Sequence, residues 1–332
     1  MNRHVALGLK LFVAGALVTW LVHSGTLDFG ALRAFVDRPA LLAADLGVLA
    51  FAIVLGALRW RLLLSLADVR LTLRRAVQLH LAGLFFNVVI PGNIGGDVVK
   101  AVYVARELPA EKRPAVYLVG FIDRLMGVLS LVALALCVTL ARGSAMWTTP
   151  GLRDLALGVS ILSGVSLGVP LIVLIVLRHT ANRREAAPTT TLRRLVAAAR
   201  ITSTRIPTLA SALLLAIGLH LSGMALFIVL TGQIASGNPA LGGIAVIYPL
   251  GMLTTVIPVS YAGIGVGHVA FERLFALVGM GGGATVFNVF LIGQTVPCLF
   301  GVFPYLALRR SAPPPTEAEA RSQQVVGYDA SA

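Results

Sequence analysis

Long apolar stretches follow one another along most of the 332-residue chain. Six of them are continuous and, at roughly 18 to 25 residues, long enough to cross the ~30 Å hydrocarbon core of a bilayer as α-helices. They cover residues 5–22, 41–64, 115–140, 154–177, 208–231 and 284–308. We therefore predict an all-α polytopic membrane protein with about six full transmembrane helices.

Two further apolar stretches are interrupted by residues that break helices. The first covers about residues 76–103 and is broken at "IPGNIGGD", and the second covers about 241–278 and is broken at "IPVSYAGIGVG". Proline removes a backbone donor from a helix, and glycine permits backbone shapes that other residues avoid. Two interpretations fit each stretch: a kinked helix that crosses the membrane, or a re-entrant or broken helical hairpin that turns back.

The distribution of lysine and arginine favours two hairpins, because basic residues in short loops stay on the cytoplasmic side. If both stretches turn back, 20 of the 27 basic residues lie on the cytoplasmic side and four on the other. Hairpin 1 (76–103) is then entered from the cytoplasm and hairpin 2 (241–278) from outside, in an inverted-repeat arrangement with both termini cytoplasmic. Paired interruptions of this kind point to a transporter's binding site, since unwound backbone at membrane depth is tolerated only where it is packed or lines a cavity.

Composition narrows the class of protein further. The chain is 57% apolar and 12% charged, and no stretch remains that is long enough for a soluble catalytic domain. A net charge of +13 in such a chain reports orientation and contact with anionic lipid, so we expect no nucleic-acid partner. No P-loop, nucleophile elbow, paired carboxylates or zinc spacing occurs, and we expect no enzymatic activity, cofactor or metal. We predict one transmembrane domain over residues 1–310 and a disordered cytoplasmic tail over 311–332.

The first break carries charged residues beside its glycines. A helix that restarts there exposes free backbone N–H groups, which need Asp97 as a cap or an anionic group of a ligand. Lys100 follows Asp97 by one helical turn, which fits either a local ion pair or a contact with a lipid phosphate. The candidate binding residues at this break are Asn93, Gly95, Gly96, Asp97 and Lys100.

The second break repeats this plan. His268 and Glu272 lie four residues apart on one helix face, where they fit a hydrogen-bonded or proton-carrying pair, or a purely structural one. No third ligand stands at a spacing typical of a metal site. The candidate binding residues here are Ser260, Gly263, Gly265, His268 and Glu272.

The segment "GFIDRLMGV" adds an adjacent acid and base, Asp123 and Arg124, within an apolar stretch. Neighbouring helical residues point about 100° apart, so each needs a partner of its own. Arg124 can meet Asp97 or a lipid phosphate, or extend to the membrane surface; Asp123 can meet Lys100 or another basic residue of hairpin 1. His80, His220 and Gln294 are single polar residues in apolar stretches, and we expect interhelical hydrogen bonds from them.

Three motifs together resemble a known family. "PGNIGGDVVKAVYV", "FIDRLMGV" and "IPVSYAGIGVGHVAFERLF" are similar to the ordered motifs of the flippase-like, lysylphosphatidylglycerol synthase transmembrane-domain family, over about residues 5–310. The sequence departs from the family pattern at Ala262, where a second glycine is usual, and at His268, where an acid is usual. The resemblance implies lipid translocation, without the aminoacyl transfer that bifunctional members perform in a soluble domain.

We therefore expect the protein to flip a polar-headed or anionic lipid between the leaflets of a bacterial-type inner membrane. The lipid classes that the resemblance implies are anionic phospholipids, aminoacylated lipids, polyprenyl-phosphate glycolipids and hopanoids. One alternative is an accessory subunit that presents lipid to a partner glycosyltransferase or synthase without transporting it. Another is a membrane-embedded enzyme that modifies lipid head groups.

Overall fold

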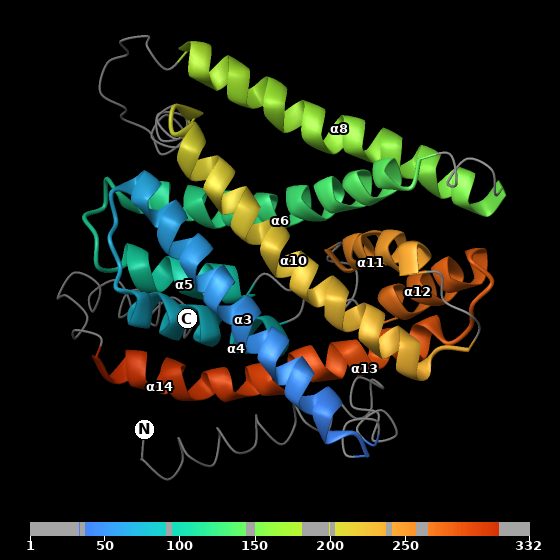
Figure 1. Cartoon of the computed structure of the whole chain (residues 1–332). Helices are drawn as coiled ribbons and strands as arrows, with labels where there is room; N and C mark the ends of the chain where they lie inside the picture. Colours follow the sequence, from blue (N-terminus) through green and yellow to red (C-terminus); the bar gives the residue numbers. More distant parts are fainter. Residues whose placement is uncertain are drawn as a thin grey trace, which may run out of the picture.

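The computed structural model describes residues 33, 37–90, 95–143, 150–180, 199, 203–236, 241–256 and 265–311. Over these ranges the chain is helical apart from short connections and one isolated bridge between Ser236 and Gly281 (Figure 1). The first half contains α3 (Pro39–Leu64), η1 (Ser65–Ala67), α4 (Leu73–Val89), α5 (Gly95–Ala105) and α6 (Arg113–Ala141), followed by α8 (Pro150–Thr180). The second half contains α10 (Ile206–Ile234), α11 (Leu241–Val256), α12 (Val266–Leu277), α13 (Gly283–Thr295), η3 (Pro297–Gly301) and α14 (Val302–Ser311).

Five helical stretches are long and apolar enough to cross a membrane, and they coincide with five of the six predicted spans. They are Pro39–Ala67, Arg113–Ala141, Ala156–Val173, Ile206–Ile234 and Gly283–Arg309. The remaining prediction, 5–22, lies outside the described residues, as do residues 312–332 of the predicted tail. Proline in the first turn fixes the start of α3, α6 and α10, where its missing N–H leaves no hydrogen bond unmade. The protein is an integral membrane protein with an all-helical described fold.

The first broken stretch forms two antiparallel helices. Gly83 and Asn87 of α4 face Gly96 of α5 so closely that a Cβ at position 96 would lie 2.1 Å from the Gly83 carbonyl oxygen. Only glycine permits this approach of the two backbones. With 17 and 11 residues, the helices span roughly 26 Å and 17 Å, and α5 is too short to cross the hydrocarbon core. The two helices therefore run in opposite directions, while residues 91–94 of the break lie outside the described part.

The second broken stretch has the same form. A Cβ at Gly251 of α11 would meet the Phe271 ring of α12, and a Cβ at Gly267 of α12 would lie 3.2 Å from the Thr255 side chain of α11. These pairs run in opposite directions along the two helices, which makes α11 and α12 antiparallel. Residues 257–264 of the break are not among the described residues, and α12 begins after Gly265, whose φ of 79° suits glycine.

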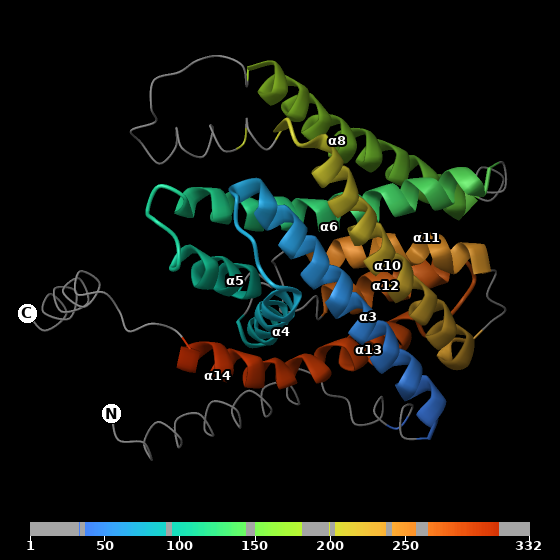
Figure 2. The same cartoon turned by 60° about the vertical axis from the view of Figure 1, so that its left-hand side comes forward.

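The packing of the elements follows one plan in both halves. α3 and α10 pack against each other in the middle of the molecule, and the α4–α5 and α11–α12 pairs lie toward opposite ends of it (Figures 1 and 2). The α4–α5 pair packs on α6 of its own half and on η3 and α14 of the other. The α11–α12 pair likewise packs on α13 of its own half and on α6 of the other. α8 packs along α6 at the outer edge, with exposed apolar side chains such as Ile161 and Val165.

Candidate functional site

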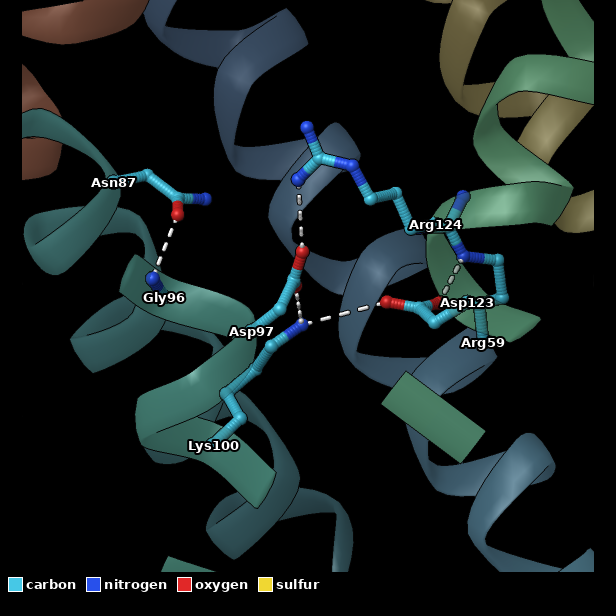
Figure 3. A network of polar contacts seen from close by, with 7 residues as sticks. All are labelled: Arg59, Asn87, Gly96, Asp97, Lys100, Asp123 and Arg124. Carbon is cyan, nitrogen blue, oxygen red and sulfur yellow. Dashed lines mark hydrogen bonds and ion pairs between the residues drawn. The ribbon is translucent and has the colours of Figure 1, made fainter. Parts of the chain in front are cut away.

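A chain of ion pairs connects α3, α5 and α6 (Figure 3). Arg59 of α3 donates from Nε to Asp123 Oδ1 at 2.7 Å. Lys100 Nζ of α5 lies 3.4 Å from Asp123 Oδ2 and 3.0 Å from Asp97 Oδ1. Asp97 Oδ2 in turn lies 3.6 Å from a terminal nitrogen of Arg124. Three cations and two carboxylates thus form one network with a formal charge of +1.

The network is buried at Arg59, Asp123 and Lys100 and partly exposed at Asp97 and Arg124. Asp123 and Lys100 are 3% and 4% exposed, and Arg59 is buried beside them. The side chains of Asp97 and Arg124 are 23% and 29% exposed. The Lys100 ammonium group also lies 4.7 Å from the centre of the Trp60 ring, which adds a cation–π contact. The Asp97–Arg124 end is therefore the more accessible and more weakly paired end of the network.

Most of the partners predicted for these residues are in contact with them in the structure. Lys100 pairs with Asp97, Arg124 with Asp97, and Asp123 with Lys100. Arg59 is the member of the network that is absent from the candidate binding residues predicted from the sequence. The signal was present in "GALRWRLLL", where Arg59 stands inside an apolar run next to a tryptophan. An arginine in that position needs a buried acid.

A cavity of about 250 Å³ adjoins the network. All five charged members line it, together with residues of α4, α10 and the last residue of α11, Val256. The cavity therefore lies between the first hairpin and the end of α11 at the second break. Buried cations with a surplus of positive charge make this space suitable for an anionic group.

Two histidines also line the cavity, His80 of α4 and His220 of α10. The His80 ring packs directly on Gly56 of α3, where a Cβ would lie 2.4 Å from Nε2. Its buried Nδ1 has no hydrogen-bond partner in the described part of the chain. The interhelical hydrogen bond predicted for His80 is therefore not observed from this atom. Nδ1 is left as a polar atom that a ligand oxygen can satisfy.

A second, mainly apolar cavity of about 370 Å³ adjoins the first. The two share Leu84, Asn87, Leu219 and His220 as lining residues. The rest of its wall comes largely from α11 and α13 and includes Tyr248, Met252 and Phe290. A polar space thus passes into an apolar one between the two halves of the protein.

The glycines at the first break serve helix packing. Gly95 and Gly96 are buried where α5 meets α4, and the N–H of Gly96 donates to Asn87 Oδ1 at 2.7 Å. Asn87 therefore caps this helix start, for which the sequence predicted either Asp97 or an anionic ligand group, and the Asp97 carboxylate faces Lys100 and Arg124 instead. Asn93, another predicted binding residue, lies outside the described residues.

The predicted residues of the second break that the structure describes do not join the network. Ser260 and Gly263 are outside the described residues, and Gly265 precedes the start of α12. His268 lies 3.3 Å from Asn288 Oδ1, and Glu272 accepts a hydrogen bond from the N–H of Ala284 at 2.9 Å. Each side chain thus binds α13 rather than the other, and neither lines the two cavities. The hypothesis of a His268–Glu272 pair is wrong for this arrangement, because α13 supplies both partners.

Comparison with known families supports the resemblance of the three motifs. Residues 5–296 match the family model described as the lysylphosphatidylglycerol synthase TM region. The comparisons with curated proteins and with solved structures find no match.

Proposed function

The chain belongs to the family of lysylphosphatidylglycerol synthase transmembrane regions, and from this premise we propose that it moves a lipid with an anionic or polar head group between the leaflets of its membrane. The observation that carries the proposal is the buried ion-pair network beside the 250 Å³ cavity. A charged side chain at the centre of a membrane helix costs about 3 kcal/mol on insertion scales, and such residues usually mark ligand pathways. Five of them around one cavity are more than helix packing requires.

The exposed end of the network is where a head group would bind. The Asp97–Arg124 pair is longer than the Arg59–Asp123 pair and more open to solvent. A lipid phosphate that enters there takes the place of the Asp97 carboxylate as partner of Arg124 and Lys100. The surplus positive charge of the network balances the phosphate charge, so no further buried cation is needed. Guanidinium groups bind phosphate with two parallel hydrogen bonds, which suits Arg124 to this role.

The neighbouring apolar cavity supports a lipid rather than a free anion as the ligand. Its walls of leucine, methionine and aromatic side chains fit an acyl or prenyl chain, while the head group stays in the polar cavity. The lipid classes consistent with this division are anionic phospholipids, aminoacylated lipids, polyprenyl-phosphate glycolipids and hopanoids with polar heads. The proposal includes no catalytic step, cofactor or nucleic acid.

The orientation in the membrane is part of the proposal. The two helix pairs enter from opposite sides as inverted, re-entrant hairpins, with both termini in the cytoplasm and the protein in an inner membrane. The count of basic residues supports this placement. The packing of each hairpin on one helix of its own half and on elements of the other half fits an inverted repeat around a central site.

The experiment is a flipping assay with purified protein. Vesicles of phosphatidylethanolamine and phosphatidylglycerol carry a trace of fluorescent phosphatidylglycerol, and an impermeant reductant bleaches the label in the outer leaflet. We expect faster loss of the protected fraction with protein than without it. Arg124→Gln should abolish the increase, whereas Arg61→Gln, an exposed arginine on α3, should leave it unchanged.

The flipping assay, repeated with a labelled lipid of each class and combined with a measurement of lipid binding, separates transport from an accessory role. A subunit that only presents lipid to a glycosyltransferase or synthase would bind the labelled lipid without moving it. Binding without flipping, for each of the four lipid classes, would overturn the transport proposal and favour the accessory one.

A further inference from the structure

A second buried acid lies on α3, away from the ion-pair network. Asp45 is completely buried, and its Oδ1 accepts a hydrogen bond from Gln294 Nε2 of α13 at 3.0 Å. Gly293 makes room for it, since a Cβ there would lie 2.5 Å from Oδ1. The other carboxyl oxygen, Oδ2, is buried and has no hydrogen-bond partner among the described residues.

Within the part of the chain that the structure describes, no cation forms an ion pair with this carboxyl group. Asp97 and Asp123 each have a lysine and an arginine within 4 Å, whereas the ion pairs of the described residues include none at Asp45. Along α3 and its N-cap, Arg38 lies seven residues before Asp45 and Arg59 lies 14 residues after it, or roughly 10 Å and 21 Å away at 1.5 Å per residue. The Arg38 guanidinium group donates to Gln233 of α10 instead. Burial without a counter-charge among the described residues disfavours the ionised carboxylate, so this arrangement favours the neutral acid.

The groups that face Asp45 are uncharged, so the charge of this site depends on whether Asp45 itself is protonated. From α13 the facing group is the uncharged Gln294 amide, and from η3 it is the Cys298 thiol, which donates to the Gln294 carbonyl oxygen at 2.9 Å. The titratable side chains that α4, α6 and α10 place against α3 are His80, Asp123 and His220, and these gather around Arg59. Among these neighbours, none supplies a positive charge to Asp45.

Asp45 also lies at a contact between the two halves of the protein. It joins α3 of the first half to α13 of the second, and its partner Gln294 lines the apolar cavity between the halves. A rearrangement that opens this cavity must loosen the contact between α3 and α13 and let water reach the carboxyl group. Asp45 then binds a proton much more tightly in one arrangement than in the other. This difference in proton affinity is the condition for coupling proton binding to the rearrangement.

We propose that Asp45 is a proton-binding site, protonated while α13 packs on α3 and ionised when the two helices part. The carboxylate takes up one proton on closing and releases it on opening, so lipid movement between the leaflets is linked to proton movement. This link rests on the proposed transport function, but the protonated state of Asp45 does not. The first experiment below is therefore independent of transport.

Infrared difference spectroscopy detects the proton directly. The carbonyl stretch of a neutral carboxylic acid should be present in the purified wild-type protein at pH 7 and absent in Asp45→Asn. Asp68→Asn, the same change at an exposed aspartate, serves as the matched control and should retain the band. Gln294→Leu removes the hydrogen bond and should shift the band to higher frequency, which gives a second readout if Asp45→Asn fails to fold. A wild-type spectrum without the band, or a band unaffected in both variants, would overturn the proposal.

A pH gradient tests the link to transport. With fluorescent phosphatidylglycerol in vesicles of phosphatidylethanolamine and phosphatidylglycerol, a gradient should accelerate flipping by the wild type and by Asp68→Asn. Asp45→Asn should lose this acceleration, and an undiminished response in that variant would contradict the coupling. If the wild type moves no labelled lipid while the infrared band is present, the transport function fails and the proton site stands.

Discussion

The two helix pairs share one architecture, but different chemistry holds each in place. The α4–α5 pair is joined to α3 and α6 through buried charges, with Asp97 and Lys100 on α5 itself. The α11–α12 pair is fixed by aromatic packing, in which the Phe271 ring stacks on Phe287 at 4.8 Å and lies 4.8 Å from Phe227. An anionic ligand can compete for the first set of contacts but not for the second. We therefore propose that the first pair binds the anionic head group, whereas the second pair is held by aromatic packing and contributes α11 to the wall of the apolar cavity.

The largest effect should come from Asp123→Ala, which leaves both Arg59 and Lys100 buried without this acid. Removing one partner of a buried ion pair typically costs about 3–5 kcal/mol, so we expect a loss of stability of this size together with loss of lipid binding. Denaturant unfolding in detergent measures the first and fluorescent-lipid binding the second. Unchanged stability would mean that the network is not buried as described.

Phe271→Ala tests the other pair. It removes a fully buried ring between two others, and a large-to-small change of this kind costs about 3–5 kcal/mol. This variant should differ from Asp123→Ala in lipid binding, because the protein that remains folded should still prefer anionic to neutral lipid. Loss of that preference, measured at equal folded fraction, would show that the α11–α12 pair also takes part in head-group recognition.

Gly96→Ala sharpens the role of close packing at the first break. The added methyl group would lie 2.1 Å from the Gly83 carbonyl oxygen, so α4 and α5 must separate, at a cost of about 1–3 kcal/mol. Gly120→Ala on α6 is the control, since nothing lies within 4 Å of its Cβ position. In thermal unfolding, Gly96→Ala should lower the melting temperature relative to the wild type and Gly120→Ala should raise it. The increase is expected because alanine is favoured over glycine by up to about 1 kcal/mol inside a helix.

Asp97→Asn should have the smallest effect on stability and the clearest effect on ligand preference. The side chain is partly exposed, so solvent screening limits the stability change to about 1 kcal/mol or less. The charge of the network rises from +1 to +2, and binding of anionic lipid should become tighter and more salt-dependent. Titration of fluorescent phosphatidylglycerol at two salt concentrations measures this, and weaker binding would show that Asp97 itself holds the ligand.

Much of this organisation follows from local sequence. Apolar length predicted the five described spans, and proline with glycine predicted where α4 and α11 end, because both signals act within a few residues. The i,i+3 spacing predicted the Lys100–Asp97 pair for the same reason. Arg59–Asp123 and Gln294–Asp45 join residues 64 and 249 positions apart. Such partners are decided by helix packing, which local patterns do not encode.

Asp45 shows what local reasoning misses. It is a single acid in the apolar run 41–64, which an average over that run conceals. The His268–Glu272 prediction failed in the opposite way, because a shared helix face does not exclude better partners on α13. In both cases the deciding contact comes from the second half of the chain.

The most direct test of the central claim is the lipid preference of the purified protein. Binding of fluorescent phosphatidylglycerol and of fluorescent phosphatidylcholine is compared in detergent for the wild type, Arg124→Gln and Arg61→Gln. We predict that the wild type and Arg61→Gln bind the anionic lipid more tightly than the zwitterionic one and that Arg124→Gln loses this preference. Equal binding of the two lipids by the wild type, or a preference that survives Arg124→Gln, would contradict the assignment of the ion-pair network as the head-group site.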